Sequence, residues 1–427
     1  MKMVMTGDSF ISRRLPCGDG RAEKVKGWMA DSNARFTNLE ITAHEGKGYP
    51  SPFSGGTWAM AEPAVLDDLR YYGFNLFNWA NNHTMDYLYG GLIATEKELD
   101  DRDMIHAGAG KTLASAAEAS YIETENGRIA LIGVTSTFHD FWIAGNGNGH
   151  IGGRPGVNPL RCEEIIHVTK EELEALRSIS SQTNLDAAEE LNRIEGFSNS
   201  GSEDEFLFAG RKFKIADEAY KERKPHQGDM DRLINKVEEA KRQADYVLVS
   251  FHSHEMTGLD KNTPADFFKE ASRRMIDAGA HCIIGHGPHV IRGIEIYRGR
   301  PIFYSLGNFI FQNDSVRHLP RDFYEKYDLD EKASAADGYD KRSAGGTKGL
   351  GVNPFVWESV MAKVEWTGGY PAKIELQPID LGFNKPRYRK GWPELSEDER
   401  VLQRLQKLSE PFDTDIRIED GKGFIYL

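Results

Sequence analysis

The stretch FNLFNWANNHTMD, residues 74–86, joins a run of apolar side chains to a cluster of amide, imidazole and carboxylate groups. Its apolar part, residues 74–80, is short and directly follows Gly73, which favours a buried strand. One helical pattern, over residues 61–72, ends at that glycine, and another follows over residues 91–103. Strands that alternate with helices are typical of an α/β sheet. The stretch therefore indicates an α/β fold with the polar cluster at the end of a strand.

Four further predicted strands also end in polar side chains. They cover residues 3–6, 34–36, 246–251 and 282–284. Binding sites of α/β sheets form at the carboxyl ends of the strands. We therefore expect one site built from all five strand ends. Together with Asn82 and His83, its candidate residues are Asp8, Asn38, Glu40, His252, His254, Glu255, His286 and His289.

Carboxylates, an amide oxygen and several histidines are together suitable ligands for Mn, Fe or Zn. Two such ions about 3.5–4 Å apart can bind a phosphoryl group and supply a hydroxide near neutral pH. Taken singly, Asp8 could belong to a turn, Asn82 and His83 to an ordinary loop, and His254 to the core. The repetition of the pattern at five strand ends favours a site for two divalent metal ions.

The composition is that of a globular protein with an acidic surface. The 427 residues carry a formal net charge of −13, and the pI is near 5.6. An acidic surface repels phosphate backbones, so nucleic acid is not an expected partner. Cys17, Cys162 and Cys282 show no metal-ligand spacing, which disfavours structural zinc and fits a reducing compartment. No apolar run reaches the roughly 18 residues of a transmembrane segment. Because the first residues also do not resemble a signal peptide, we expect a cytoplasmic location.

Two regions depart from the alternation of strands and helices. Residues 138–227 begin with a Gly-rich loop and continue in Glu-rich helical patterns. This predicts an inserted helical subdomain or lid within one domain over residues 1–427, and a lid would set substrate preference. Arg154 in this insertion could contact an anionic substrate or be an ordinary solvated loop residue. Residues 313–352 are polar and Gly-rich, which predicts a mobile surface loop.

The order of these motifs resembles that of the bacterial capsule-biosynthesis CapA, or poly-γ-glutamate synthesis, family of calcineurin-like metallophosphatases. ANNHTMD at residues 80–86 is similar to the family's ANNHxxD, GHGPH at 285–289 to its GHxPH, and YSLGNF at 304–309 to its YSLGNF. The remaining motifs of the resemblance are Gly7-Asp8, Asn38-Leu39-Glu40, and His252 with Glu255.

This resemblance implies a four-layer αββα sandwich of the calcineurin-like metallophosphatase type, with a helical insertion and one dinuclear site. His83 would protonate the leaving oxygen or stabilise the transition state, and Asp86 would orient His83. Ser305 and Asn308 would line the site. The implied ligands are Asp8 and His289 for the first ion, Glu40 for both ions, and Asn82, His252 and His286 for the second.

The chain departs from the family pattern at three places. Calcineurin-like phosphatases usually have Asp-x-His at the first motif, and here Phe10 stands in place of the histidine. Glu40 takes the place of an aspartate, and Ser253-His254 the place of tryptophan and glycine. Because phenylalanine cannot bind a metal, the first site loses a ligand, and it would then be either weak or completed by another residue such as His254 or Glu255.

Three hypotheses about function follow. The first is a metal-dependent phosphoesterase acting on a small-molecule or polymer-linked anionic substrate. The second is a non-hydrolytic factor for assembly or binding of a capsule or poly-γ-glutamate polymer. The third is hydrolysis of a γ-glutamyl amide, since a metal-activated hydroxide also attacks carbonyl carbon.

Overall fold

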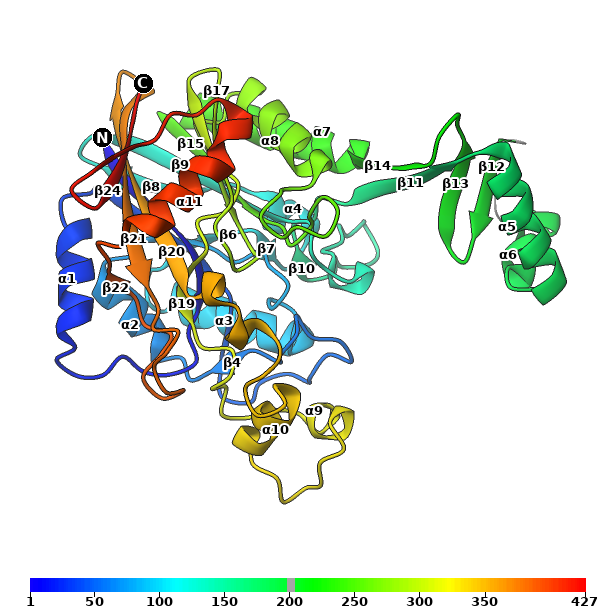
Figure 1. Cartoon of the computed structure of the whole chain (residues 1–427), viewed down its shortest axis with the longest axis horizontal. Helices are drawn as coiled ribbons and strands as arrows, with labels where there is room; N and C mark the ends of the chain where they lie inside the picture. Colours follow the sequence, from blue (N-terminus) through cyan, green and yellow to red (C-terminus); the bar gives the residue numbers. More distant parts are fainter. Residues whose placement is uncertain (198–203) are drawn as a thin grey trace.

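The larger of two central sheets has ten strands among residues 1–197 and 204–427, which are the residues that the computed structural model describes (Figure 1). Strands β1, β2, β5 and β6 run parallel, β19 joins β1 in parallel, and the strands on the other side of β1 are antiparallel. In sheet order the strands are β23 (Arg417–Glu419), β24 (Lys422–Tyr426), β21 (Tyr370–Asp380), β20 (Glu358–Thr367), β1 (Lys2–Phe10), β2 (Ala34–Leu39), β5 (Leu76–Asn78) and β6 (Ile105–Ala107), with β19 (Asn308–Phe311) beside β1 and β22 (Glu394–Leu395) beside β21.

A second sheet of six strands is built mainly from the middle of the chain. Its three inner strands β9, β15 and β16 run parallel, and β18 joins β16 in the same direction. In sheet order the strands are β17 (Ile294–Tyr297), β18 (Arg300–Phe303), β16 (Cys282–His286), β15 (Tyr246–His252), β9 (Gly127–Thr135) and β8 (Ser120–Thr124).

Three apolar cores hold the sheets and helices together. One core includes Met5 and Phe36 of the larger sheet with Leu131 and Leu248 of the smaller, so these two faces pack on each other. The second packs the opposite face of the larger sheet against α1 (Gly20–Met29), α2 (Val65–Tyr72) and α3 (Leu88–Asp100). The third packs the opposite face of the smaller sheet against α7 (Gln227–Gln243) and α8 (Asp266–Asp277). The chain is therefore α/β with mixed sheets, as the sequence predicts.

The predicted helices over residues 61–72 and 91–103 correspond to α2 and α3. Gly73 ends α2 with a φ of +96°, in the left-handed region where glycine is favoured. Within the described part of the chain, no helix is both long and apolar enough to cross a membrane. The smaller elements are β3 (Thr42–Ala43) paired with β4 (Met60–Ala61), β7 (Ala109–Gly110) paired with β10 (Gly156–Val157), α4 (Leu113–Ala117) and α11 (Glu399–Ser409).

The inserted segment is not wholly helical, which corrects the prediction for residues 138–227. It contains α5 (Lys170–Thr183) and α6 (Ala187–Ile194), but also a four-stranded sheet, and Figure 1 shows this part standing away from the rest of the molecule. Sequences such as RKFKI and YKERKP lack the apolar alternation of a half-buried strand, because these strands are largely exposed. Residues 198–203 of the predicted insertion lie outside the described residues. The strands are β12 (Glu205–Phe208), β13 (Arg211–Ile215), β11 (Cys162–Val168) and β14 (Tyr220–Pro225).

Residues 313–352 are also more ordered than the predicted surface loop. They form α9 (Arg321–Lys326) and α10 (Ala335–Arg342), followed by a short 3₁₀ turn, Leu350–Val352. Ser334 caps α10, and the Tyr339 hydroxyl donates a hydrogen bond of 3.0 Å to the Val316 carbonyl. The sequence did not predict these short helices, because the stretch is polar and its few apolar side chains, such as Phe323, are widely spaced.

Candidate metal centre

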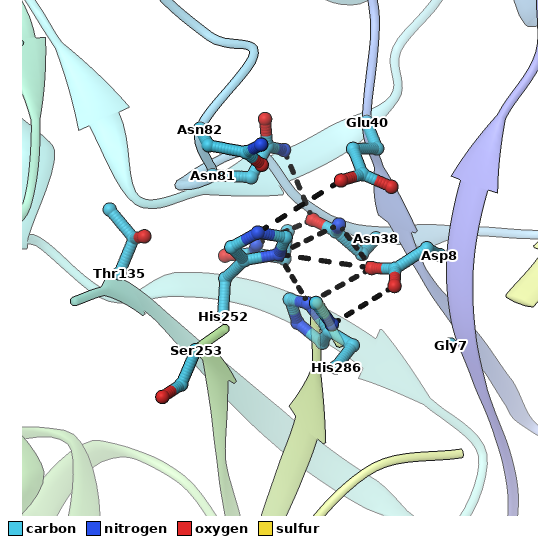
Figure 2. A network of polar contacts seen from close by, with 12 residues as sticks. Gly7, Asp8, Asn38, Glu40, Asn81, Asn82, Thr135, His252, Ser253 and His286 are labelled. Carbon is cyan, nitrogen blue, oxygen red and sulfur yellow. Dashed lines mark hydrogen bonds and ion pairs between the residues drawn. The ribbon is translucent and has the colours of Figure 1, made fainter. Parts of the chain in front are cut away.

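Two groups of three side chains, each able to hold a metal ion, lie where strands of the two sheets end. Asp8, His252 and His286 form one group, and Glu40, His254 and His289 form the other. Within each group the potential ligand atoms all lie within 4.8 Å of one another. Strand register explains the convergence, because His252 pairs with His286 across β15 and β16, and Asp8 pairs with Asn38 across β1 and β2. Figure 2 shows Asp8, Glu40, His252 and His286 pointing toward one another.

The Asp8 carboxylate is held in a fixed orientation. Its Oδ1 accepts a hydrogen bond of 2.8 Å from the Asn38 side-chain amide, and its Oδ2 accepts one of 2.9 Å from the Gly287 N–H. His286 Nδ1 lies 3.3 Å from Oδ1. Burial alone would raise the pKa of Asp8, but the hydrogen bond and charge of His286, with His289 and Asn38, lower it overall. The carboxylate is therefore ionised, as a metal ligand must be.

Glu40 has no hydrogen-bond donor at either carboxylate oxygen among the described residues, although both oxygens are buried. Its Oε1 lies 3.9 Å from His252 Nε2, and its Oε2 lies 3.9 Å from His289 Nδ1. Burial, together with the charges of Asp8 and Asp86, raises the pKa of Glu40 well above its usual value. A buried carboxylate without a donor is costly unless a cation compensates it, so this position fits a metal ligand.

The histidines contact one another through their ring nitrogens. His252 Nδ1 is 3.0 Å from His286 Nδ1, and His252 Nε2 is 3.0 Å from His254 Nε2. Burial and the neighbouring imidazoles lower the pKa of His252 and of His254 well below the usual value, and burial also lowers that of His289. A lowered pKa favours the neutral form of His252, His254 and His289, which has a lone pair available for a cation.

Asn82 and His83 lie in the segment that follows β5 of the larger sheet. The side-chain amide of Asn82 donates a hydrogen bond of 3.0 Å to the Gly55 carbonyl, and its buried Oδ1 has no partner among the described residues. His83 Nδ1 lies 2.7 Å from Asp86 Oδ2. The carboxylate of Asp86 also accepts hydrogen bonds from the backbone N–H groups of Gly55 and Ala59, at 3.0 and 2.7 Å. Asp86 thus contacts the His83 ring and is itself held by the backbone, an arrangement that suits an orienting residue.

Comparison with known proteins agrees with this geometry. Residues 2–313 match the model of a family described as "Bacterial capsule synthesis protein PGA_cap". The chain belongs to the PGA_cap family. This family is part of the metallophosphatase-like superfamily. The recognition made from the motifs is therefore confirmed, and all six residues of the two metal-ligand groups lie within the matched region.

Relatives of different lengths share this PGA_cap region. Two Sinorhizobium fredii proteins, "Uncharacterized protein y4sH" and "Uncharacterized protein y4uA", are each 34% identical over 100% of this chain and 93% of their own length. "PGA biosynthesis protein CapA" of Bacillus subtilis is 29% identical over 59% of this chain and 46% of its own. "Capsule biosynthesis protein CapA" of Bacillus anthracis is 26% identical over 74% of this chain and 61% of its own length.

Three of the additional candidate residues support their neighbours in this PGA_cap centre. Asn38 binds Asp8 and accepts hydrogen bonds at Oδ1 from the side-chain amides of Asn78 and Asn81, at 2.7 and 3.2 Å. Asn308 Oδ1 lies 2.9 Å from His289 Nδ1 and orients that ring. Ser305 Oγ accepts the Gly307 N–H at 3.1 Å and shapes the turn before Asn308.

Glu255 and Arg154 lie outside the two metal-ligand groups. The Glu255 carboxylate accepts hydrogen bonds from the hydroxyls of Ser136, Thr137 and Ser253, at 2.8, 3.2 and 2.9 Å. Through these hydrogen bonds the Glu255 carboxylate stabilises the loop that carries His254. Arg154 donates to the Ile143 carbonyl at 2.9 Å in an exposed loop and does not line the cavity beside the centre.

Residues that the sequence did not single out form the far wall of that cavity, which has a volume of about 590 Å³. Phe10, His83 and His289 line it on the side of the metal centre. The described residues of the insertion 138–227 do not line it, which is against the expectation of a lid there. In the sequence, the feature that could have indicated this wall is the clustering of basic residues near three glycines at positions 345–349. The basic residues in the wall are Arg342, Lys348, Arg387 and Lys390.

Proposed function

We propose that this PGA_cap protein is a metal-dependent phosphoesterase with a dinuclear site, built on a four-layer αββα sandwich of the calcineurin-like type. The observation that carries the proposal is the buried Glu40 carboxylate. It lies within 3.9 Å of a histidine nitrogen from each metal-ligand group and has no hydrogen-bond donor among the described residues. In this proposal residues 138–227 are a subdomain inserted into one domain that spans residues 1–427.

The side chains present fit two divalent ions. Asp8, His252 and His286, with the free Oδ1 of Asn82, would hold one, and Glu40, His254 and His289 would hold the other. Glu40 lies within 3.9 Å of nitrogens from both groups, which suits a bridging ligand. When bound, ions such as Mn, Fe or Zn would polarise a phosphoryl oxygen and lower the pKa of a water molecule.

In this proposal His83 is the residue that moves a proton. Its Nδ1 is bound to Asp86, so Nε2 is the nitrogen left to face a substrate in the cavity that His83 lines. A histidine in this position donates a proton to the leaving oxygen as the ester bond breaks. Phe10 packs edge-on against the His83 ring, with 5.1 Å between centroids, and limits its movement.

A second candidate function is binding or assembly of a capsule or poly-γ-glutamate polymer without hydrolysis. The observation in its favour is the naming of the two Bacillus relatives, "PGA biosynthesis protein CapA" and "Capsule biosynthesis protein CapA". In that case the same centre would bind anionic groups of the polymer. Metal content alone does not separate the two functions, so turnover must be measured.

The test combines elemental analysis with hydrolysis of p-nitrophenyl phosphate and bis-p-nitrophenyl phosphate after addition of Mn²⁺. We expect about two metals per chain. We also expect a loss of about 10²–10⁴ in kcat for His83→Ala with metal retained, and loss of metal for His286→Ala. His150→Ala, which removes an exposed histidine outside the centre, is the matched control and should behave as the wild type. Two bound metals without turnover of either ester would reject the phosphoesterase function and favour the binding function.

A further inference from the structure

The cavity beside the metal centre has a wall that the phosphoesterase chemistry does not use. Four basic residues line it, and Asp314 is the one acidic residue among its described lining residues. This local excess of positive charge occurs in a protein with a formal net charge of −13. A cavity of the opposite sign to the whole molecule concentrates anions at that point. The wall therefore points to a negatively charged part of the substrate.

Two of the four cations are already paired with carboxylates. Arg387 pairs with Asp340 and lies 3.7 Å from Asp314, and Lys390 lies 3.0 Å from Asp314. Across residues 1–197 and 204–427, by contrast, neither Arg342 nor Lys348 has an ion-pair partner. Their charges are the ones available to a ligand.

Arg342 is held in place by uncharged neighbours. Its guanidinium group donates hydrogen bonds to the Thr57 hydroxyl and, at 3.2 Å, to the Asn313 carbonyl. It lies over the Tyr339 ring at 5.0 Å and near the Phe323 ring at 5.9 Å. An arginine has five N–H groups, so most of its donors remain for a planar oxyanion. Its planar group is positioned before any ligand arrives, which reduces the entropy lost on binding.

We propose that Arg342 and Lys348 bind a second oxyanion of the substrate, so that the substrate is a phosphate ester that also carries a carboxylate or another phosphate group. This inference rests on the proposed phosphoesterase function, because the first anion is the phosphoryl group at the metal centre. Both residues follow position 313, where the match to the PGA_cap family ends, while the two Sinorhizobium relatives extend over the whole chain. The second-anion site is thus a feature of the part outside the family match.

The test is calorimetric binding of substrate-like phosphonates to the Mn²⁺-loaded full-length protein. The probes are carboxylate-terminated alkylphosphonates and bisphosphonates with chains of different length, each compared with the methyl-terminated alkylphosphonate of the same length. For at least one length we expect the probe with two anionic groups to have a Kd about 10- to 100-fold lower than its match with the phosphonate group alone. The preferred end group identifies the second oxyanion as carboxylate or phosphate.

The variant Arg342→Gln/Lys348→Gln should lose this preference. Lys341→Gln, which removes the same charge from an exposed residue next to the wall, should keep it. Lys348→Gln alone changes an exposed residue without ion pairs among the described residues, and should lose the preference in part even if the double variant folds poorly. Equal Kd values for all matched probes, or a preference that survives in the double variant, would overturn the inference. Failure of the phosphoesterase proposal would appear separately, as absence of p-nitrophenyl phosphate hydrolysis.

Discussion

Replacement of Glu40 by glutamine should make the metal-free protein more stable. Both carboxylate oxygens of Glu40 are buried and lack donors in the described structure, and burial raises its pKa well above the usual value. A buried acceptor without a partner costs about 1–3 kcal/mol, and a charged one costs more. Glu40→Gln removes the charge at nearly constant volume. We therefore expect its free energy of unfolding without metal to exceed that of the wild type by about 1–3 kcal/mol.

With metal bound, the wild type should be more stable than Glu40→Gln. A ligand present at about 100 times its Kd stabilises the folded state by about 2.7 kcal/mol. The wild type should gain at least this amount from Mn²⁺, whereas the glutamine variant should gain little, because it lacks the charge that binds the cation. Urea unfolding followed by tryptophan fluorescence, once with a chelator and once with excess Mn²⁺, gives all four free energies.

Glu295→Gln is the matched control for this experiment. Glu295 is also a buried glutamate, but its carboxylate accepts hydrogen bonds of 2.9 Å from Arg273 and 2.5 Å from Tyr304. The control variant should lose stability by a similar amount with and without metal. A Glu40→Gln protein that is less stable than the wild type in chelator would refute the reasoning. Equal stabilisation of both proteins by Mn²⁺ would refute it as well.

Three further changes test the rest of the molecule. Burial lowers the pKa of His281 from 6.5 to about 3. The neutral His281 therefore contributes to stability above pH 6.5, and this contribution is lost as the pH falls toward 3. When the pH is lowered from 7 to 5, the free energy of unfolding, measured with urea, should fall by about 2 kcal/mol less in His281→Gln than in the wild type. Gly7→Ala would place a Cβ 1.8 Å from the Gly307 carbonyl oxygen, so unfolding should require about 1–3 kcal/mol less, whereas Gly27→Ala, which has open space, should not destabilise. Residues 164–223 can be excised and replaced by a two-residue turn that joins the paired strands β11 and β14. This variant should keep its metal content and its kinetics with p-nitrophenyl phosphate, because the described residues of the insertion do not line the cavity. Altered kinetics would show that the insertion acts as a lid.

The strand ends could be predicted because each combines a buried apolar run with polar residues directly after it. His252 and His286 are examples, since each is the last residue of a fully buried strand and the two are paired by strand register. The grouping of the ligands could not be predicted in the same way. The resemblance joined His289 to Asp8, and its Nδ1 does lie 3.7 Å from Asp8 Oδ2, yet the group whose ligand atoms all lie within 4.8 Å of one another places it with Glu40 and His254.

The inserted sheet and the basic wall escaped prediction for physical reasons. The strands β11 to β14 are solvated on much of their surface, so burial leaves no alternating pattern in their sequence. Arg342 and Lys348 lie in a polar stretch far along the chain from His83. Only the fold brings that stretch to the same cavity, so no spacing in the sequence links the two.

The exchanges at Phe10 and His254 fall on different sheets. Phe10 lies on β1 of the larger sheet, where its ring packs against His83 and Phe311 and offers no ligand atom. His254 follows β15 of the smaller sheet and places Nε2 3.0 Å from His252 Nε2. In the proposed dinuclear centre, His254 would therefore supply from the smaller sheet the nitrogen that Phe10 cannot supply from the larger one.

A ligand supplied from a loop must be held as firmly as one supplied from a strand. The loop of His254 meets this condition on both sides. Arg292, which is fully buried, donates hydrogen bonds to the carbonyls of Ser253 and Glu255 at 3.4 and 3.0 Å. The Glu255 carboxylate in turn binds the hydroxyls of Ser136 and Thr137 beyond the end of β9. Because the loop is fixed in this way, we infer that the centre has kept its number of ligands and has moved one of them from the larger sheet to the smaller.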